Sequence, residues 1–161
     1  MIKPSALVVD DNKITTKLLG RYLSPAGYAV REAYDGVECL ERVAEEHPDA
    51  IVMDVMMPRL DGYETVKRLK SDPATAHIPV VIVTALNDVA NQVKAIESGA
   101  DDFLSKPIED KLLLAKVRLL STVSIERKKA LALKDLLLQA TRGQLTEAQA
   151  KEKIAELGLQ A

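Results

Sequence analysis

Short apolar runs alternate with longer amphipathic segments along the chain, and the alternation occurs five times. The apolar runs are rich in β-branched residues and predict strands near residues 5–10, 28–33, 49–54, 78–84 and 101–105. The amphipathic segments predict helices near residues 13–24, 36–46, 62–71, 88–98 and from residue 109 onward. Because strands that are apolar throughout are typical of parallel sheets covered on both faces, we predict an open α/β fold.

Polar side chains stand where four of these apolar runs end. Asp10 and Asp11 follow the first run, Asp54 ends the third, Thr84 ends the fourth, and Lys106 follows the fifth. The carboxyl ends of parallel strands meet at one edge of the sheet, which is where ligands bind in open α/β folds. We therefore expect three carboxylates, one hydroxyl and one ammonium group in one pocket, which predicts a site for a divalent cation and a phosphoryl group.

The three carboxylates predict a Mg2+ site, since hard cations of this kind take oxygen ligands. We expect Asp11 and Asp54 to bind the metal directly and Asp10 to act through a water molecule. An alternative for Asp10 and Asp11 is helix capping at a strand-to-helix turn, because Asp is favoured at that position. Carboxylates packed this closely repel one another and would take up protons without a cation, which favours the metal.

Asp54 also has the chemistry of a nucleophile, because a carboxylate can attack phosphorus and form an acyl phosphate. A bound metal would shield the charge that develops in that step. Thr84 and Lys106 are expected to contact the phosphoryl oxygens, one as a hydroxyl donor and the other as a cation. Each of them alone could be an ordinary strand residue or surface lysine, so only their joint placement points to a site. Pro107 fixes the loop beside Lys106 and, if its peptide bond is cis, could aim Lys106 inward.

Four motifs resemble the receiver domain of bacterial two-component response regulators, over residues 1–122. They are Asp10-Asp11, the stretch DVMMPRLDG that begins at Asp54, the triplet VTA around Thr84, and the stretch FLSKP that begins at Phe103. The resemblance implies a flavodoxin-like, doubly wound five-stranded parallel sheet in the order 2-1-3-4-5. The stretches SDPATAHIPVVIVTAL and SGADDFLSKPI are most similar to receivers attached to diguanylate cyclases.

The same resemblance implies a phospho-acceptor in signal transduction, which catalyses only its own phosphorylation and slow dephosphorylation. Asp54 would take a phosphoryl group from a sensor histidine kinase or a phosphotransfer protein, with Mg2+ on Asp11, Asp54 and the backbone carbonyl of Met56. Thr84 and Phe103 would form a switch, in which the hydroxyl moves toward the phosphoryl group and the ring turns inward. This would change the face formed by the fourth helix, fifth strand and fifth helix. A permanently buried ring is the alternative for Phe103.

Two apolar residues occupy positions that influence the attack of water on the acyl phosphate in this family. They are Met56 and Leu86, which lie two residues beyond Asp54 and Thr84. Polar side chains at these positions tend to orient the attacking water, and neither Met nor Leu can do so. We therefore expect a long-lived phosphoryl state.

Residues 123–161 predict a helical extension that continues the fifth helix. From Glu109 the chain has neither Pro nor Gly until Gly143, so this helix is expected to run beyond the receiver. Steps of four and three residues predict a coiled-coil seam with one polar position, for dimerisation or partner binding: Leu119, Val123, Glu126, Ala130, Leu133, Leu137 and Ala140. A helix that folds back on its own domain is the alternative. A capping box from Thr146 to Gln149 predicts a second helix and hence a helical hairpin.

Composition narrows the class of partners and the compartment. The formal net charge of -2 argues against nucleic-acid binding, and the basic run Arg127-Lys128-Lys129 is typical of a solvated face. The single cysteine, Cys39, excludes an internal disulfide and fits a reducing compartment. No apolar run approaches the ~18 residues of a membrane span, and the start of the chain lacks the pattern of a signal peptide. We therefore expect a cytoplasmic protein without a membrane partner.

The sequence leaves two other functions open. The chain could be a receiver fragment of a multidomain regulator such as a diguanylate cyclase, although no GG(D/E)EF motif occurs and the capped hairpin argues mildly against a linker. A Mg2+-dependent phosphohydrolase would use Asp54 in rapid turnover. Such enzymes usually place Asp-x-Asp after the first strand, whereas this chain has Asp10-Asp11-Asn12. The favoured interpretation is a phospho-activated receiver that forms a homodimer or binds a partner.

Overall fold

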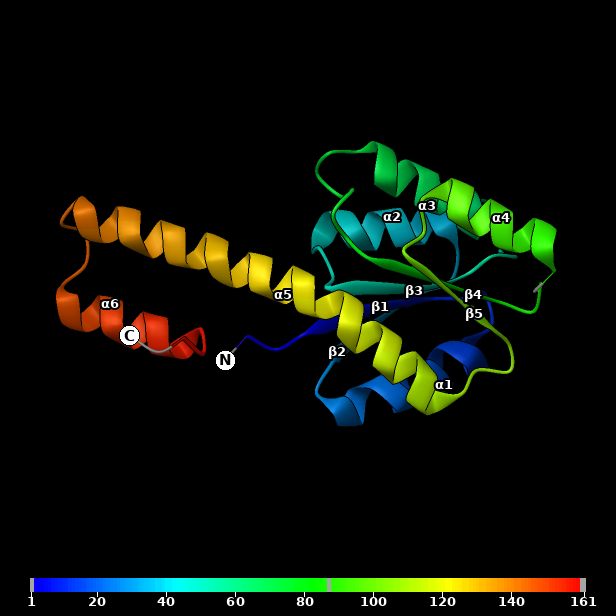
Figure 1. The fold of residues 1–161 in the computed structure, drawn as a ribbon, viewed down its shortest axis with the longest axis horizontal. Helices are drawn as coiled ribbons and strands as arrows, with labels where there is room; N and C mark the ends of the chain where they lie inside the picture. Colours follow the sequence, from blue (N-terminus) through cyan, green and yellow to red (C-terminus); the bar gives the residue numbers. More distant parts are fainter. Residues whose placement is uncertain (1, 87, 160–161) are drawn as a thin grey trace.

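The computed structural model describes residues 2–86 and 88–159, and a five-stranded parallel sheet lies at its centre (Figure 1). The strands are β1 Ser5–Val9, β2 Ala29–Ala33, β3 Ala50–Asp54, β4 Val80–Thr84 and β5 Asp102–Ser105. Their order is β2-β1-β3-β4-β5, which confirms the order that the resemblance implied. The winding reverses between β1 and β3, so the carboxyl ends of these two strands are the expected ligand position.

Six α-helices accompany these strands in the described part of the chain. They are α1 Lys13–Leu23, α2 Gly36–Glu45, α3 Gly62–Ser71, α4 Val89–Ser98, α5 Asp110–Thr141 and α6 Glu147–Glu156. A short 3-10 helix, η1 Ser24–Ala26, follows α1. The ends of the predicted strands and of the first four predicted helices agree with the structure to within two residues.

Helices cover both faces of the sheet (Figure 1). α2, α3 and α4 pack on one face, for example through Val43 and Leu69. α1 and α5 pack on the other, for example through Leu19 and Leu113. Burying one such aliphatic side chain stabilises the fold by about 1.5–3 kcal/mol. Every residue of β1, β3 and β4 is buried, so the strand ends that carry the polar residues are held firmly.

Cys39 belongs to this core and is fully buried. Burial raises the pKa of its thiol to about 12. The thiol therefore stays protonated at physiological pH and is a poor nucleophile.

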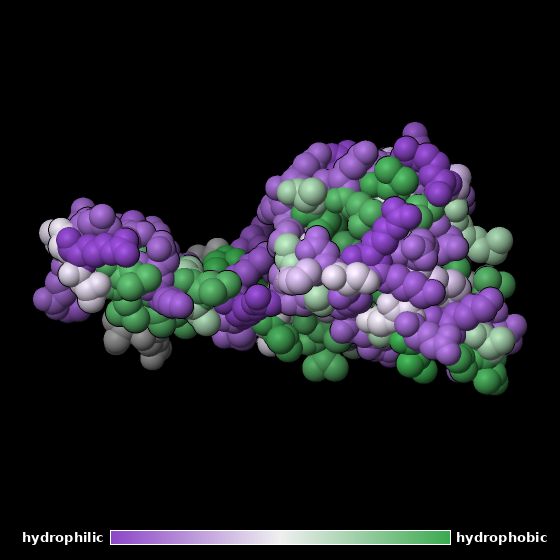
Figure 2. Space-filling view, turned by 90° about the horizontal axis from the view of Figure 1, so that it is seen from above, coloured by the Kyte–Doolittle hydropathy of each residue, from purple (hydrophilic) through white to green (hydrophobic). Residues whose placement is uncertain are grey.

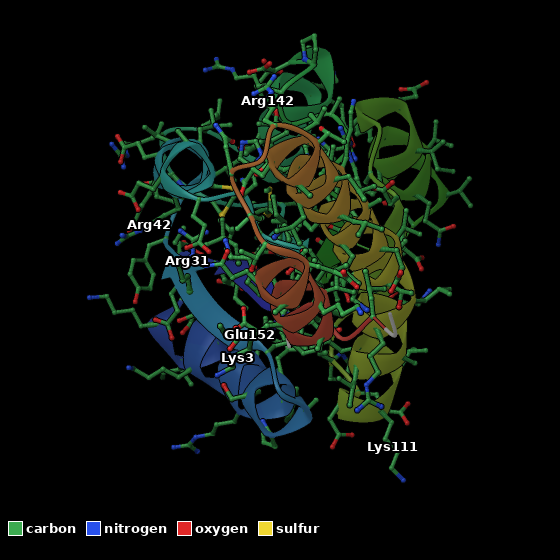
Figure 3. The ribbon with its side chains drawn as sticks, turned by 90° about the vertical axis from the view of Figure 1, so that its left-hand side faces the viewer. Lys3, Arg31, Arg42, Lys111, Arg142 and Glu152 are labelled. Carbon is green, nitrogen blue, oxygen red and sulfur yellow. The ribbon has the colours of Figure 1, made fainter. Side chains whose placement is uncertain are left out.

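α5 continues past the body of the α/β domain and forms a projecting arm with α6 (Figure 1). The helix does not fold back on its own domain; α6 runs back along it instead. Gly143 makes the turn with a left-handed φ of 69°, and the predicted capping box of Thr146 and Gln149 is present at the start of α6. Figure 3 views the molecule from the side of this arm, with Lys111 and Arg142 labelled near the two ends of α5.

A buried carboxylate, Asp49, fastens the arm at the amino edge of the sheet. Asp49 accepts hydrogen bonds from the backbone N–H of Ser5 (2.8 Å) and the hydroxyl of Ser124 (3.1 Å). The ammonium group of Lys128 lies 2.8 Å from the same carboxylate. Contacts between α5 and the body therefore continue beyond residue 122. None of the helices within residues 2–86 and 88–159 has the length and apolar composition needed to cross a membrane.

Candidate functional site

Three carboxylates meet at the carboxyl ends of the neighbouring strands β1 and β3. One oxygen from each of Asp10, Asp11 and Asp54 lies within 4.8 Å of the others. Asp10 is 2% exposed and Asp54 is 9% exposed, whereas Asp11 faces solvent. The register pairs Val9 with Met53, so the residues that end or follow the two strands emerge together.

The helix cap beside this cluster is Asn12. Its side-chain oxygen accepts hydrogen bonds from the backbone N–H groups of Ile14 (2.9 Å) and Thr15 (3.4 Å). The carboxylate of Asp10 accepts a hydrogen bond from the backbone N–H of Asn12 at 2.8 Å. The alternative in which Asp10 and Asp11 cap the helix is therefore wrong, because the cap position belongs to the next residue.

Lys106 reaches the cluster from the loop between β5 and α5. Its Nζ atom lies 3.2 Å from Oδ2 of Asp10 and 3.5 Å from Oδ1 of Asp54. Its backbone N–H donates to the carbonyl of Thr84 at 3.0 Å, which fastens this loop to β4. The peptide bond between Lys106 and Pro107 is cis. The ammonium group therefore bridges the two buried carboxylates, in the pocket where the sequence placed Lys106.

The charges in this pocket shift the pKa values of the groups that form it. Burial raises the pKa of Asp54, the neighbouring carboxylate of Asp10 raises it further, and Lys106 opposes both effects. Partial burial alone would lower the pKa of Lys106, but Asp54 and Asp10 outweigh burial, so the pKa is raised. Three carboxylates with one ammonium leave an excess of negative charge, which a cation would relieve.

The donors in this pocket fit a hard divalent cation such as Mg2+. The cluster consists of carboxylate oxygens, with neither His nor Cys among its members, and Mg2+ prefers such ligands over nitrogen or sulfur. Mg2+ also keeps several water molecules when it binds protein. The exposed position of Asp11 leaves one side of the cluster open to solvent for these waters.

Thr84 and Phe103 lie on the neighbouring strands β4 and β5. Thr84 is 1% exposed, and its hydroxyl oxygen accepts a hydrogen bond from the backbone N–H of Leu86 at 3.1 Å. Phe103 is only partly buried against the core, and it lines a surface pocket together with Ile96 of α4. The structure therefore does not support the alternative of a permanently buried ring for Phe103.

The loop between β3 and α3 carries Met56, the remaining expected metal ligand. Gly62 closes the base of this loop, because its N–H donates to the carbonyl of Val55 at 2.8 Å. A Cβ atom on Gly62 would collide with the backbone carbonyl oxygen of Asp54, so only glycine fits here. The side chains of Met56 and Leu86 are 67% and 37% exposed, and neither carries a group that could orient a water molecule.

Our interpretation of the sequence missed a second contact of this loop, the ion pair between Arg59 and Asp35. The Nε atom and one terminal nitrogen of Arg59 each lie 2.7 Å from Oδ2 of Asp35. Arg59 has a left-handed φ of 64°, which is uncommon for a residue with a side chain. In the sequence, Asp35-Gly36 indicates only the start of a helix, and nothing links it to a residue more than twenty positions away.

Comparison with known proteins agrees with this geometry. The family model for the response regulator receiver domain matches residues 6–118. The response regulator PleD of Caulobacter vibrioides is 47% identical over 115 residues, which are 71% of this chain and 25% of PleD. The response regulator MprA of Mycobacterium ulcerans is 46% identical over 114 residues, which are 71% of this chain and 48% of MprA. The crystal structure of a response regulator from Chloroflexus aurantiacus covers 75% of this chain and 99% of its own, with 35% identity and a TM-score of 0.72.

The chain thus spans between about a quarter and a half of the length of these curated relatives. PleD and MprA match equally well, so an affinity with receivers attached to diguanylate cyclases stays a prediction. The family match over residues 6–118 is to response regulator receivers, which favours this interpretation over the enzyme alternative.

Proposed function

Because the chain belongs to the response regulator receiver family, we propose that Asp54 is the phospho-acceptor of a two-component signalling system. The observation that carries this proposal is the convergence of Asp10, Asp11 and Asp54 on one point beside the ammonium group of Lys106. The donor is a sensor histidine kinase or a phosphotransfer protein. Because receivers of this family are typically cytoplasmic, we also expect the protein to act in the cytoplasm.

The proposed step moves one phosphoryl group from nitrogen to oxygen. A carboxylate oxygen of Asp54 forms a bond to phosphorus, the phosphorus–nitrogen bond of the donor breaks, and the electron pair leaves with the imidazole. Lys106 and the hydroxyl of Thr84 contact the phosphoryl oxygens and stabilise their charge. Asp54 is then an acyl phosphate, and its hydrolysis returns the carboxylate.

Asp11, Asp54 and the backbone carbonyl of Met56 would hold Mg2+, and Asp10 would act through a water molecule. When bound, this ion would neutralise the charge of the phosphoryl group and of the carboxylates around it. The negative charge of the pocket supports the assignment, because the raised pKa of Asp54 reflects burial and repulsion from Asp10.

The output would follow from a change at Thr84 and Phe103. In the structure the Thr84 hydroxyl accepts a hydrogen bond from the backbone N–H of Leu86. Phosphorylation would draw the hydroxyl away from this N–H. The ring of Phe103 would then turn into the space that is released. Such a switch is a shift between two populations, and the phosphoryl group favours one of them only through its different contacts in the two. The face of α4, β5 and α5 would change in consequence.

We assign residues 123–161 to dimerisation or partner binding. Figure 2 shows hydrophobic side chains on the surface of the arm. Leu131 and Leu137 are each 57% exposed, and Val123 is 74% exposed. Nucleic acid is a poor alternative partner, because two residues of the basic run are engaged in ion pairs, Lys128 with Asp49 and Lys129 with Glu126. Attachment of this receiver to a diguanylate cyclase in a longer protein is compatible with the same site.

The test uses radiolabelled acetyl phosphate or phosphoramidate as donor. We expect one Mg2+-dependent phosphoryl group per chain, no label in Asp54→Asn, and full label in the control Asp61→Asn, since Asn also caps a helix well. Label that persists in Asp54→Asn would contradict the proposal. Decay of the wild-type label should take far longer than seconds, because Met56 and Leu86 cannot orient water. Decay within seconds would contradict this expectation alone.

A further inference from the structure

We infer that the ion pair between Arg59 and Asp35 holds the β3–α3 loop in the shape that metal binding requires, which makes Arg59 a positioning residue. The inference rests on the proposed function, because this loop carries the Met56 carbonyl. Neither residue belongs to the metal or phosphoryl site itself. The pair instead joins the loop to the start of α2.

Asp35 provides a fixed anchor. One of its carboxylate oxygens accepts a hydrogen bond from the backbone N–H of Glu38 at 2.8 Å and so caps α2. The other oxygen is left for Arg59. Burial alone would raise the pKa of Asp35, but the hydrogen bonds from Glu38 and Arg59 outweigh it and lower the pKa. The carboxylate is therefore charged throughout the physiological range.

Arg59 needs this anchor because of its backbone. A φ of 64° brings the Cβ atom close to the following carbonyl oxygen, which disfavours every residue except Gly and, to a lesser degree, Asn and Asp. The hydrogen bond from Nε, together with the close approach of a charged terminal nitrogen to the same carboxylate oxygen, forms a charge-assisted contact that offsets this cost. Without the contact, Arg59 would relax toward a right-handed or extended conformation and would change the course of the loop.

Two backbone hydrogen bonds also hold the β3–α3 loop, and they show which part of it the Arg59–Asp35 pair affects. The N–H of Gly62 donates to Val55 at the base (2.8 Å), and the N–H of Gly36 donates to the carbonyl of Leu60 (3.2 Å). Met56 lies between the base and these outer contacts. Mg2+ demands a nearly ideal octahedron with bonds of about 2.0–2.1 Å. A small displacement of the Met56 carbonyl therefore weakens binding even when all carboxylates are in place.

Mg2+ affinity and loop dynamics test this inference in the full chain. Calorimetric titration with Mg2+ should give a dissociation constant ~10-fold higher for Arg59→Gln than for wild type, the lower end of what residues behind metal ligands contribute. Amide hydrogen exchange without Mg2+ should be faster at the non-proline residues among 56–60 of this variant. Asp35→Asn keeps a good helix cap and should show the same loss. The double variant should lose no more than either single variant, because both remove one contact.

Arg68→Gln is the matched control, since Arg68 forms an exposed ion pair on α3 and its side chain is 56% exposed, against 57% for Arg59. This control should change neither readout. Arg59→Gln with wild-type affinity and exchange would overturn the inference, as would additive losses in the double variant. A wild-type protein that binds no Mg2+ would refute the proposed metal site itself, so the two failures are distinguishable.

Discussion

Asp54 combines its proposed chemical role with a cost to the folded state. Its pKa is raised by burial and by the charge of Asp10. A carboxyl group whose pKa is higher in the folded than in the unfolded state stabilises the fold only when it is protonated. Above that pKa the charged carboxylate of Asp54 therefore destabilises the fold. The destabilisation decreases as the pH falls toward the pKa.

We expect Asp54→Asn to stabilise the metal-free protein at neutral pH. The gain should be about 1 kcal/mol, or a Tm rise of about 2–4 °C for a chain of this length. Asn can still accept the hydrogen bond from the backbone N–H of Val55, and Lys106 keeps its contact with Asp10. Thermal unfolding at neutral and at mildly acidic pH measures the effect, which should shrink in acid. A variant that is less stable than wild type without Mg2+ would contradict this account.

At the level of elements, β3 carries a buried carboxylate at each end. Asp54 ends the strand at the proposed phosphoryl site, and Asp49 precedes the strand at the opposite edge. Asp49 is fully buried, and its charge is balanced by Lys128 of α5 at 2.8 Å. An unbalanced buried charge is expensive, so this contact contributes to the attachment of the arm to the receiver.

Lys128→Met should therefore destabilise the protein by about 1–3 kcal/mol, because the carboxylate of Asp49 loses its counter-charge. Adding Asp49→Asn should recover part of the loss, since it removes the charge itself. Lys151→Met is the control: its pair with Glu147 is largely exposed, and the effect should stay below about 0.5 kcal/mol. Urea unfolding measures all four proteins. Equal stability of Lys128→Met and wild type would show that the ion pair between Lys128 and Asp49 contributes nothing to stability.

The elements and the site residues could be predicted because their signals are local. Apolar runs, capping residues and strand-end polar residues placed Asp10, Asp54 and Lys106 together, and the structure confirms this convergence. The functional roles of these residues stay predictions. The Arg59–Asp35 and Lys128–Asp49 pairs could not be predicted, because each joins charged residues far apart in sequence that look like ordinary surface residues. Such pairs depend on the register of whole elements.

At the scale of the whole molecule, the carboxyl ends of the strands, where we place the phosphoryl site, and the arm lie at opposite edges of the sheet (Figure 1). A signal from Asp54 must therefore reach the arm through the body of the receiver. The exposed apolar side chains continue from the receiver onto the arm, with Leu119 at 72% and Val123 at 74% exposure. In a dimer, a single seam along α5 could thus run from the face of α4, β5 and α5 onto the helical extension.

Light scattering with Mg2+ and beryllofluoride, a mimic of the acyl phosphate, tests this arrangement. We expect the molar mass to double in wild type but not in Asp54→Asn. Val123→Glu should prevent doubling by placing a charge in the seam, and its Tm should stay close to that of wild type because the side chain is exposed. Ile14→Glu, on α1 and 79% exposed, is the matched control and should dimerise normally. If the mimic leaves the molar mass unchanged, the output is binding to a different protein and not homodimerisation. If the mass of Val123→Glu doubles, this seam is not the interface.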